Sequence, residues 1–469
     1  MKCFTAALVV FPLFGCSPKD EALLDTGGFS FGEVKIEKVE ANAHAVWVSV
    51  GVSEPARIRV EFSQLGESPL VTAWSDEAVR HRVPLVGLLG GADSVVVVHA
   101  ETPQGEFISE PLDFSTSEAA EFRRPTVSGD SLDRRPNGVM YLMDQTDRRT
   151  SAGADGPTRF VGVDQLGRLI WDHNSGDNTL GHAPFVEVLE TGNFFYRTAT
   201  GGVELTPMGE IVASFDAGED LHHDAERLPN GNWVLMTQTY DTVESEELGP
   251  FTVVGDGLVE VDPEGKEVWR WEIRDHLDWE ETQTEFNDPS EGLKRSDWTH
   301  ANSVQYVEED DGFLMSIRHL SQVIFIDRSS GEILWTLGEG GDFELTKGVW
   351  FSGQHDAQLL GNGEMLLYDN SLNGSLPESR GLRLGLDFDE MSVEILQEFN
   401  AGVAAYSMGS IRLLESGGVL LSSGGHRTDG VPSRVMEFGP AGEEVLRMEQ
   451  ALMKQLNYRT GAYYYAEPL

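Results

Sequence analysis

Short apolar strands separated by glycine turns recur along most of this chain. In residues 223–238 and 355–370, alternating apolar and polar positions run up to an Asn-Gly pair and resume after it. This pattern is the strongest short-range signal of a β-hairpin, because a tight hairpin turn needs positive φ. A second hairpin follows the first one in each repeat, as in residues 257–269 after 223–238 and in residues 323–335 of the repeat that begins near residue 300. Two successive hairpins predict a four-stranded sheet as the repeating unit.

Six such units can be counted between residues 124 and 469. Radial repetition of four-stranded sheets is typical of a β-propeller, in which the inner strands converge on a central axis. We therefore predict an all-β chain in which residues 124–469 form a six-bladed β-propeller. Functional side chains at the start of each inner strand would then lie close together near that axis.

The segment before the propeller has a different pattern of apolar and polar residues. Residues 45–52, 56–62 and 94–100 alternate apolar and polar side chains in short runs, and no useful helical periodicity interrupts them. Short alternating strands of this kind favour a small sandwich. We expect an immunoglobulin-like or fibronectin-like β-sandwich over residues 29–117, followed by a short polar linker.

The first residues predict export. An apolar run over residues 4–14 is too short to span a bilayer and is typical of a signal peptide, here residues 1–15. The Gly15-Cys16 pair indicates lipoprotein processing, with Cys16 acylated and residues 16–28 as a tether. We expect a cell-envelope lipoprotein of the periplasm or outer membrane that meets the membrane only through this anchor, with plain secretion or a chance apolar start as the alternatives. The remaining cysteine, Cys3, leaves with the signal peptide, so the mature chain has no disulfide.

The net charge of -44 arises from 78 acidic and 34 basic residues. Such a field repels nucleic acid and anionic lipid, so neither is an expected partner. A solvated acidic surface on an exported protein explains the charge most simply.

Three of the repeats open on a histidine: His223, His300 and His355. If the turn at residues 308–310 folds back symmetrically, His300 faces Arg318. The same folding sets Asn302 opposite Ser316, places Asp369 or Asn370 beside His355, and brings Gln238 to His223. The sequence thus predicts three imidazoles at one repeat register, gathered with an arginine and several amides.

This predicted cluster is cationic, rich in donors and free of the carboxylate pair that a glycosidase needs. Convergent donors suit an oxyanion such as sulfate or phosphate, with Arg318 as a fork-shaped ligand. Three histidines can also bind zinc, but the neighbouring guanidinium argues against a cation, so we expect no metal. The other propeller histidines that stand out are interpreted as packing or turn residues: His182, His222, His319 and His426.

Together, residues 223–232, 298–303, 316–318, 326–338, 354–356 and 367–370 resemble the bacterial arylsulfate sulfotransferase family. The similarity covers the propeller and is strongest over residues 221–371. It implies an exported six-bladed propeller with an N-terminal β-sandwich. It also implies transfer of a sulfuryl group from an aryl sulfate donor to a phenolic acceptor without a nucleotide donor, by a ping-pong mechanism through a sulfated histidine.

By motif, the resemblance implies that His355 is the nucleophile. His223, His300 and Arg318 then match positions for sulfate binding and proton handling. We expect Asn302, Ser316 and Asn370 to contact the substrate. Sulfuryl transfer has a loose transition state stabilised by positioned cations, which such a cluster supplies. No cofactor is expected, the partners are small molecules, and a homodimer is left open.

Two other classes of function stay open at this point. One is a non-catalytic propeller that binds a ligand or assembles envelope proteins. The other is a metal- or quinone-dependent enzyme on the same scaffold, since Trp171, Trp269 and Trp335 at blade ends are also typical of quinoprotein propellers.

Overall fold

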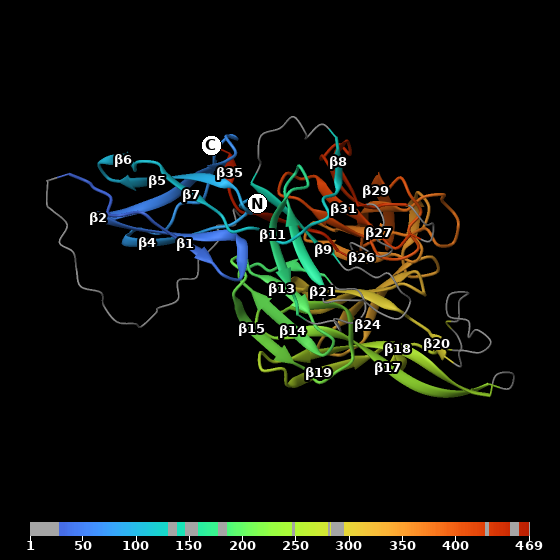
Figure 1. The fold of residues 1–469 in the computed structure, drawn as a ribbon. Helices are drawn as coiled ribbons and strands as arrows, with labels where there is room; N and C mark the ends of the chain where they lie inside the picture. The colour runs from blue at the N-terminus through green and yellow to red at the C-terminus, as the bar shows by residue number, and fades with distance from the viewer. Residues whose placement is uncertain are drawn as a thin grey trace.

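The structure is a computed structural model that describes residues 28–129, 138–145, 158–176, 185–245, 249–279, 282, 295–426, 431–450 and 459–468. Within these ranges the regular structure is almost entirely β-strand, and six sheets, three of four strands and three of five, form a ring. The predictions of an all-β chain and a six-bladed propeller are confirmed (Figure 1). Cys16 and His182 lie outside the described residues.

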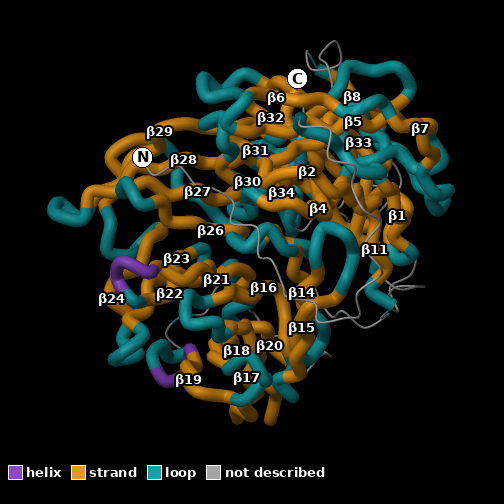
Figure 2. Tube along the Cα trace, turned by 90° about the vertical axis from the view of Figure 1, so that its left-hand side faces the viewer, coloured by secondary structure: helices purple, strands orange, loops and turns teal. Residues whose placement is uncertain are grey.

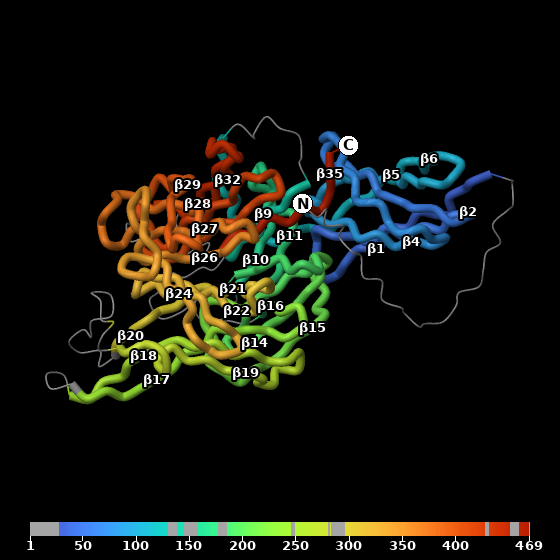
Figure 3. Tube along the Cα trace, turned by 180° about the vertical axis from the view of Figure 1, so that it is seen from behind, coloured from blue at the N-terminus to red at the C-terminus, as the bar shows by residue number. Residues whose placement is uncertain are grey.

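The first three blades use strands of very different length. Blade 1 contains β9 (Val139–Gln145), β10 (Arg159–Val163), β11 (Leu169–Asn174) and β34 (Gly461–Tyr464). Blade 2 contains β12 (Glu187–Val188), β13 (Phe194–Arg197), β14 (Gly201–Leu205) and β15 (Ile211–Asp216). Blade 3 contains β16 (Leu221–Arg227), β17 (Trp233–Ser245), β18 (Gly249–Val261), β19 (Glu267–Glu272) and a parallel fifth strand, β20 (Arg295–Asp297). The long hairpin of β17 and β18 projects from the ring on the side away from the N-terminal sheet (Figure 3).

The last three blades complete the ring. Blade 4 contains β21 (Ala301–Val307), β22 (Gly312–Ile317), β23 (Gln322–Asp327) and β24 (Ile333–Gly338). Blade 5 contains β26 (His355–Leu360), β27 (Glu364–Asp369), β28 (Arg380–Asp387), β29 (Ser392–Asn400) and the added strand β25 (Glu344–Lys347). Blade 6 contains β30 (Ser410–Leu413), β31 (Val419–Ser423), β32 (Ser433–Phe438), β33 (Glu444–Gln450) and the added strand β8 (Thr126–Ser128). Two short 3-10 helices, η2 (Ile273–Asp275) and η3 (Glu308–Asp310), lie between strands.

Both ends of the propeller sequence close the ring. The C-terminal strand β34 pairs with β9 and is the innermost strand of blade 1, while β8 adds an outer edge to blade 6. The inner strands β16, β21, β26 and β30 therefore lie around the middle of the ring (Figure 2). Segments far apart in sequence therefore complete blade 1 and extend blade 6, which closes the ring.

The N-terminal part is one curled sheet beside the propeller. Its strands are β1 (Lys35–Val39), β2 (Asn42–Gln64), β3 (Leu70–Val71), β4 (Ala78–Leu85), β5 (Asp93–Thr102), β6 (Gly105–Ile108), β7 (Leu112–Ser115) and β35 (Glu467–Pro468). The first half of β2 pairs with β1 and β4 and the second half with β3 and β5, so this single strand runs through both layers of the predicted sandwich. Because β35 pairs with β3, the end of the chain ties the propeller to this sheet.

The core follows from the alternation in the sequence. In the second half of β2, Ile58, Val60 and Phe62 are buried and pack on Val96 and Val98 of β5, since alternate side chains face the same layer. Between blades, apolar faces pack on each other in the same way. Among the described residues, no helix has the length and apolar character required to cross a bilayer.

Candidate active site

The inner strands of neighbouring blades are joined at one repeated position. At this position a side-chain oxygen accepts a hydrogen bond from a backbone N–H of the next inner strand. The acceptors and amides pair as follows: Asp224 with Val304, Ser303 with Ala357, Asp356 with Ile411, and Ser410 with Thr460. These contacts give a common register for β16, β21, β26 and β30.

This register corrects one prediction about the histidines. His223 and His355 each precede the acceptor residue of their strand by one position, so they are equivalent. His300 lies three positions before its acceptor, Ser303, and Asn302 occupies the equivalent site instead. The prediction that three histidines share one register is therefore wrong for His300.

Backbone irregularities bring His300 back to the cluster. Both His223 (φ 53°) and His300 (φ 46°) have left-handed backbone, which is uncommon outside glycine and costs free energy that surrounding contacts must offset. The hairpin of β21 and β22 shifts register after Ala301. Upstream of the shift, the amide of Arg318 donates to the carbonyl of His300 at 3.4 Å, as the symmetric fold predicted.

Beyond the shift, the predicted pairing fails by one residue. Ser303, not Asn302, pairs with Ser316. Both Asn302 and Ser316 are fully buried, and both contact Gln354 of the next blade, through its carbonyl and its side-chain amide respectively. The structure thus places these two predicted substrate ligands in contacts between blades.

The pairing predicted for His223 is also wrong. Upstream of the irregularity in β16, Leu221 pairs with Thr237. Gln238, the predicted partner of His223, instead pairs with Asp256 of β18. The register shifts between Leu221 and Ala225, so counting residues from the turn does not give the partner of His223.

His355 is fixed through its ring nitrogens. Its backbone pairs with Tyr368, but its Nδ1 lies 2.7 Å from Oδ1 of Asn370, one of the two partners predicted. The Asn370 Nδ2 donates to the carbonyls of Ala405 and Met408, which orients the Oδ1 toward the imidazole. The Met408 amide donates to the His355 Nε2 at 3.2 Å. His355 is therefore held as the neutral tautomer with its proton on Nδ1.

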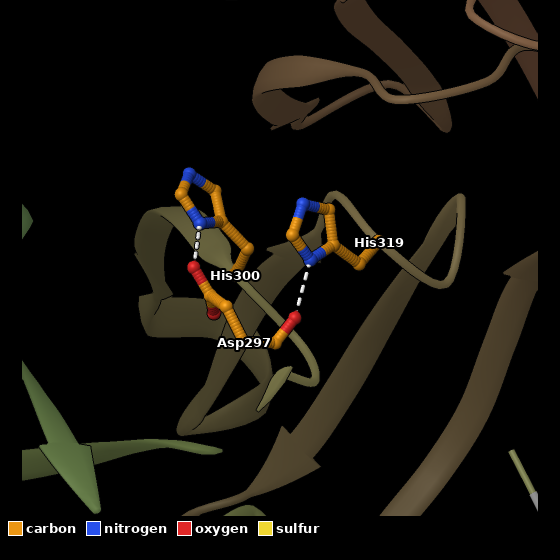
Figure 4. Close-up of side chains that lie close together, drawn as sticks. All are labelled: Asp297, His300 and His319. Carbon is orange, nitrogen blue, oxygen red and sulfur yellow. Dashed lines mark hydrogen bonds and ion pairs between the residues drawn. The ribbon is translucent and has the colours of Figure 1, made fainter. Parts of the chain in front are cut away.

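His300 is paired with a carboxylate that the sequence prediction had missed. Its Nδ1 lies 2.5 Å from Oδ2 of Asp297, and His319 donates from its own Nδ1 to the Asp297 carbonyl (Figure 4). Burial alone would raise the pKa of Asp297, but its hydrogen bond to His300 and the nearby histidines outweigh burial and lower this pKa to about 2. The sequence analysis excluded a carboxylate pair and did not foresee this single carboxylate, which orients the His300 ring through its Nδ1.

Asp297, His300 and His319 could also present ligand atoms to a metal ion, since these atoms lie within 4.8 Å of one another. The Nε2 of His319, however, accepts a hydrogen bond from Nη1 of Arg318 at 2.7 Å. Burial and the charges of His300 and Arg318 lower the pKa of His319 to about 4. The ring nitrogens of His319 are thus engaged, and the adjacent guanidinium disfavours a cation at this place.

Arg318 is held by contacts with His319 and Tyr406. Its Nη2 donates to the Tyr406 carbonyl at 2.9 Å, and its guanidinium lies 4.9 Å from the centre of the Tyr406 ring. Burial and the Arg318 charge hold the pKa of His355 well below its usual range, so that imidazole is neutral. Arg318 contacts Tyr406, and the adjacent Ala405 and Met408 contact Asn370 and His355, so the arginine and His355 line one site.

His223 is the third imidazole of the cluster. Its ring centre lies 5.0 Å from that of His300, and its Nδ1 lies 2.8 Å from Nδ1 of His222. Burial first, then His300, His222 and His355, lower the pKa of His223 well below its usual range. His222 in turn places its Nε2 3.1 Å from Oδ1 of the buried Asp256. The interpretation of His222 and His319 as ordinary packing residues is wrong, since both contact the cluster directly.

Beneath the cluster, a buried ion network fills the centre of the propeller. Arg459 donates to both carboxylate oxygens of Asp224, at 2.9 and 2.6 Å, and lies 3.1 Å from Asp356. Asp224 and Asp356 directly follow His223 and His355 in the sequence. One arginine at the closing end of the chain therefore supports the backbone of two site histidines.

The fold and this site define a six-bladed propeller with a buried cluster of histidines and arginine where its inner strands begin. The sequence model described as Arylsulfotransferase (ASST) matches residues 131–459, which is most of the chain. The chain belongs to the arylsulfotransferase family. Membership supports a transferase that acts on small molecules.

A comparison with curated proteins found no significant match. Among solved structures, TolB from Acinetobacter baumannii is similar at 12% identity and a TM-score of 0.39, with 79% of each chain covered. The Kuenenia stuttgartiensis hydrazine synthase is similar at 8% identity and a TM-score of 0.34, covering 60% of this chain and 69% of that one. Likenesses this distant carry no argument about function.

Proposed function

We propose that this protein transfers a sulfuryl group from an aryl sulfate to a phenol by a ping-pong mechanism, with His355 as the nucleophile that becomes a sulfohistidine. The observation that carries the proposal is the tautomer of His355. Because Asn370 Oδ1 accepts the hydrogen bond of the Nδ1–H, the lone pair that attacks is on the Nε2. This lone pair accepts a hydrogen bond from the Met408 amide, which the donor must displace, and it lies in the field of the Arg318 cation. A neutral imidazole next to a fixed guanidinium is suited to attack on an oxyanion.

In the first half-reaction, the Nε2 of His355 attacks the sulfur of the donor. The N–S bond forms, the bond from sulfur to the phenolic oxygen breaks, and the leaving phenolate takes one proton from the site. Arg318 and His300, whose ring Asp297 orients, stabilise the charge that spreads over the sulfuryl oxygens.

In the second half-reaction, the oxygen of the acceptor phenol attacks the sulfur of sulfohistidine. The new S–O bond forms, the N–S bond breaks, and the phenolic proton returns to the site. His355 regains its neutral state, so proton and sulfuryl group balance over one cycle. No external oxidant or nucleotide is needed.

A chromogenic aryl sulfate, incubated with and without added phenol, tests this function. We expect release of the coloured phenol to rise severalfold with acceptor, because water is a poor substitute for the second substrate. Release that ignores the acceptor would indicate a sulfatase. No release at all would contradict the proposal and favour a ligand-binding propeller.

We further propose that Cys16 is lipidated and anchors the protein to an envelope membrane, because Gly15-Cys16 follows a short apolar run. Multiple acyl chains on one cysteine make anchoring stable where one chain is marginal. Changing Cys16→Ser should move the protein from the membrane fraction to the soluble fraction after cell lysis, as measured by immunoblotting of both fractions. Unchanged retention in the membrane fraction would contradict lipidation.

A further inference from the structure

The geometry points to a proton relay behind His223: we propose that His222 and Asp256 accept the charge when His223 takes the proton of the acceptor phenol. His223 would be the catalytic base, and the other two would be positioning residues that act through it. This inference rests on the proposed function and adds the route of the proton to it.

The contacts of His222 set the direction of its hydrogen bonds. Its Nε2 faces two acceptors, the Thr237 carbonyl at 3.1 Å and the Oδ1 of Asp256 at 3.1 Å. A ring nitrogen between two acceptors must carry a proton. In a neutral His222, the Nδ1 is then the acceptor, and it lies 2.8 Å from Nδ1 of His223. His223 therefore donates from its Nδ1 and keeps the lone pair of its Nε2.

Protonation of His223 at its Nε2 sets the relay in motion. The phenolic O–H bond breaks and an N–H bond forms at this nitrogen. The Nδ1 proton of His223 can then cross the 2.8 Å hydrogen bond to the Nδ1 of His222. Both transfers leave each nitrogen with a normal valence. The positive charge ends on His222, next to the carboxylate of Asp256, instead of on His223 itself.

Burial decides where this positive charge is most stable. His222, His223 and Asp256 are all buried, at 3%, 8% and 1% exposure, so a charge there needs a partner. The groups that face this relay are His300, His355, Arg197 and Asp297 as well as the three residues themselves. His300, His355 and Arg197 disfavour a cation on His223, whereas His222 has Asp256 in contact. Moving the charge one ring away is therefore favourable.

Asp256 is held rigidly for this role. Its Oδ2 accepts hydrogen bonds from the Thr299 hydroxyl and the Ala301 amide, the latter at 2.6 Å, so its Oδ1 is directed at His222. Thr299 and Ala301 flank His300, so one carboxylate orients both histidine groups. When the reaction runs in the donor direction, the same pair returns its proton to the leaving phenolate.

His222→Gln is the decisive variant. A glutamine side chain can still donate to the Thr237 carbonyl and accept from the Nδ1 of His223, but it cannot take a proton. We expect desulfation of the His355 adduct by phenol to fall about tenfold to a hundredfold near neutral pH. The remaining rate should climb with pH, because only the pre-ionised phenolate would react, whereas the wild-type rate levels off. Asp256→Asn should give the same change in pH profile.

Donor-only labelling separates this inference from the proposed function. Wild type and both variants, mixed with 4-nitrophenyl sulfate alone, should all form the adduct on His355, since this phenolate leaves without needing a proton. His81→Gln, the same substitution at a buried histidine of β4, is the matched control and should keep the wild-type rate and profile. Labelled variants with a wild-type pH profile would overturn the relay alone. An equal loss of desulfation rate at every pH would also overturn the relay, because it would indicate a structural role. Wild type that forms no adduct would overturn the proposed function and the relay with it.

Discussion

Replacing His355 with alanine should abolish sulfuryl transfer, lowering kcat by at least about a thousandfold. The Nε2 of His355 is the atom that forms the covalent bond, so both half-reactions depend on it. Intact-mass measurement after adding donor without acceptor should show one sulfuryl adduct on wild type and none on the His355→Ala variant. Peptide mapping should locate the wild-type adduct on His355.

The effect must be separated from a loss of folding. His81→Ala removes a buried imidazole from the N-terminal sheet and should leave labelling unchanged, which controls for the substitution itself. Thermal midpoints of both variants show whether the propeller is intact. An adduct on His223 or His300 in the wild-type protein would overturn the choice of nucleophile. Turnover by His355→Ala at the wild-type rate would overturn covalent catalysis altogether.

The repeat pattern was enough to predict the architecture. Hairpins bounded by Asn230-Gly231 and Asn362-Gly363 recur with alternating apolar strands, and each glycine has the positive φ that such turns need, 88° and 77°. The alternation of apolar and polar residues depends only on neighbouring positions, so it can be recognised without knowing how the blades are arranged. Closure by β34 was not foreseen, because pairing between strands more than 300 residues apart leaves no local signal.

The site was predicted in part, because strand register depends on bulges. Counting from a symmetric turn correctly placed Arg318 opposite His300, where the hairpin is still in step. One extra residue at the bulge was enough to move Asn302 out of its predicted pairing with Ser316. A one-residue shift also turns a side chain to the other face of the strand. Side-chain assignments beyond a bulge therefore need the structure.

The residues that contact the predicted histidines from behind were missed for a different reason. His222 and His319 are each adjacent to a predicted residue, and sequence alone cannot say which of two neighbours faces the site. Asp297 lies three residues before His300, a spacing that could have suggested a pair had the backbone turn been known. Asp256 comes from β18, and only the packing of blade 3 brings it to His222.

Replacing Arg459 with methionine should open the closing strand and displace two site histidines. Arg459 is buried and bonds both oxygens of Asp224, and it also contacts Asp356. Removing one partner of a buried ion pair typically costs about 3–5 kcal/mol, because the remaining charges stay uncompensated. Since 1.4 kcal/mol corresponds to about tenfold, local opening of β34 should become about a hundredfold to a few thousandfold more frequent. Native-state hydrogen exchange of the amides that join β34 to β9 measures this directly.

The Arg459→Met variant should lose catalytic activity as well as protection of β34 amides from hydrogen exchange. Arg459 holds Asp224 and Asp356, and these residues directly follow His223 and His355 in their strands. Arg447→Met in β33 is the matched control, since that arginine forms a partly exposed pair with Glu444, and surface pairs contribute only about 0–1 kcal/mol. Arg459→Lys keeps the charge but loses the two-pronged contact with Asp224, and should fall between the two. Exchange in β34 that stays at the wild-type rate in Arg459→Met would contradict a role for this arginine in closing the ring. Faster exchange with unchanged labelling of His355 would show that the network holds the C-terminal strand without positioning the histidines.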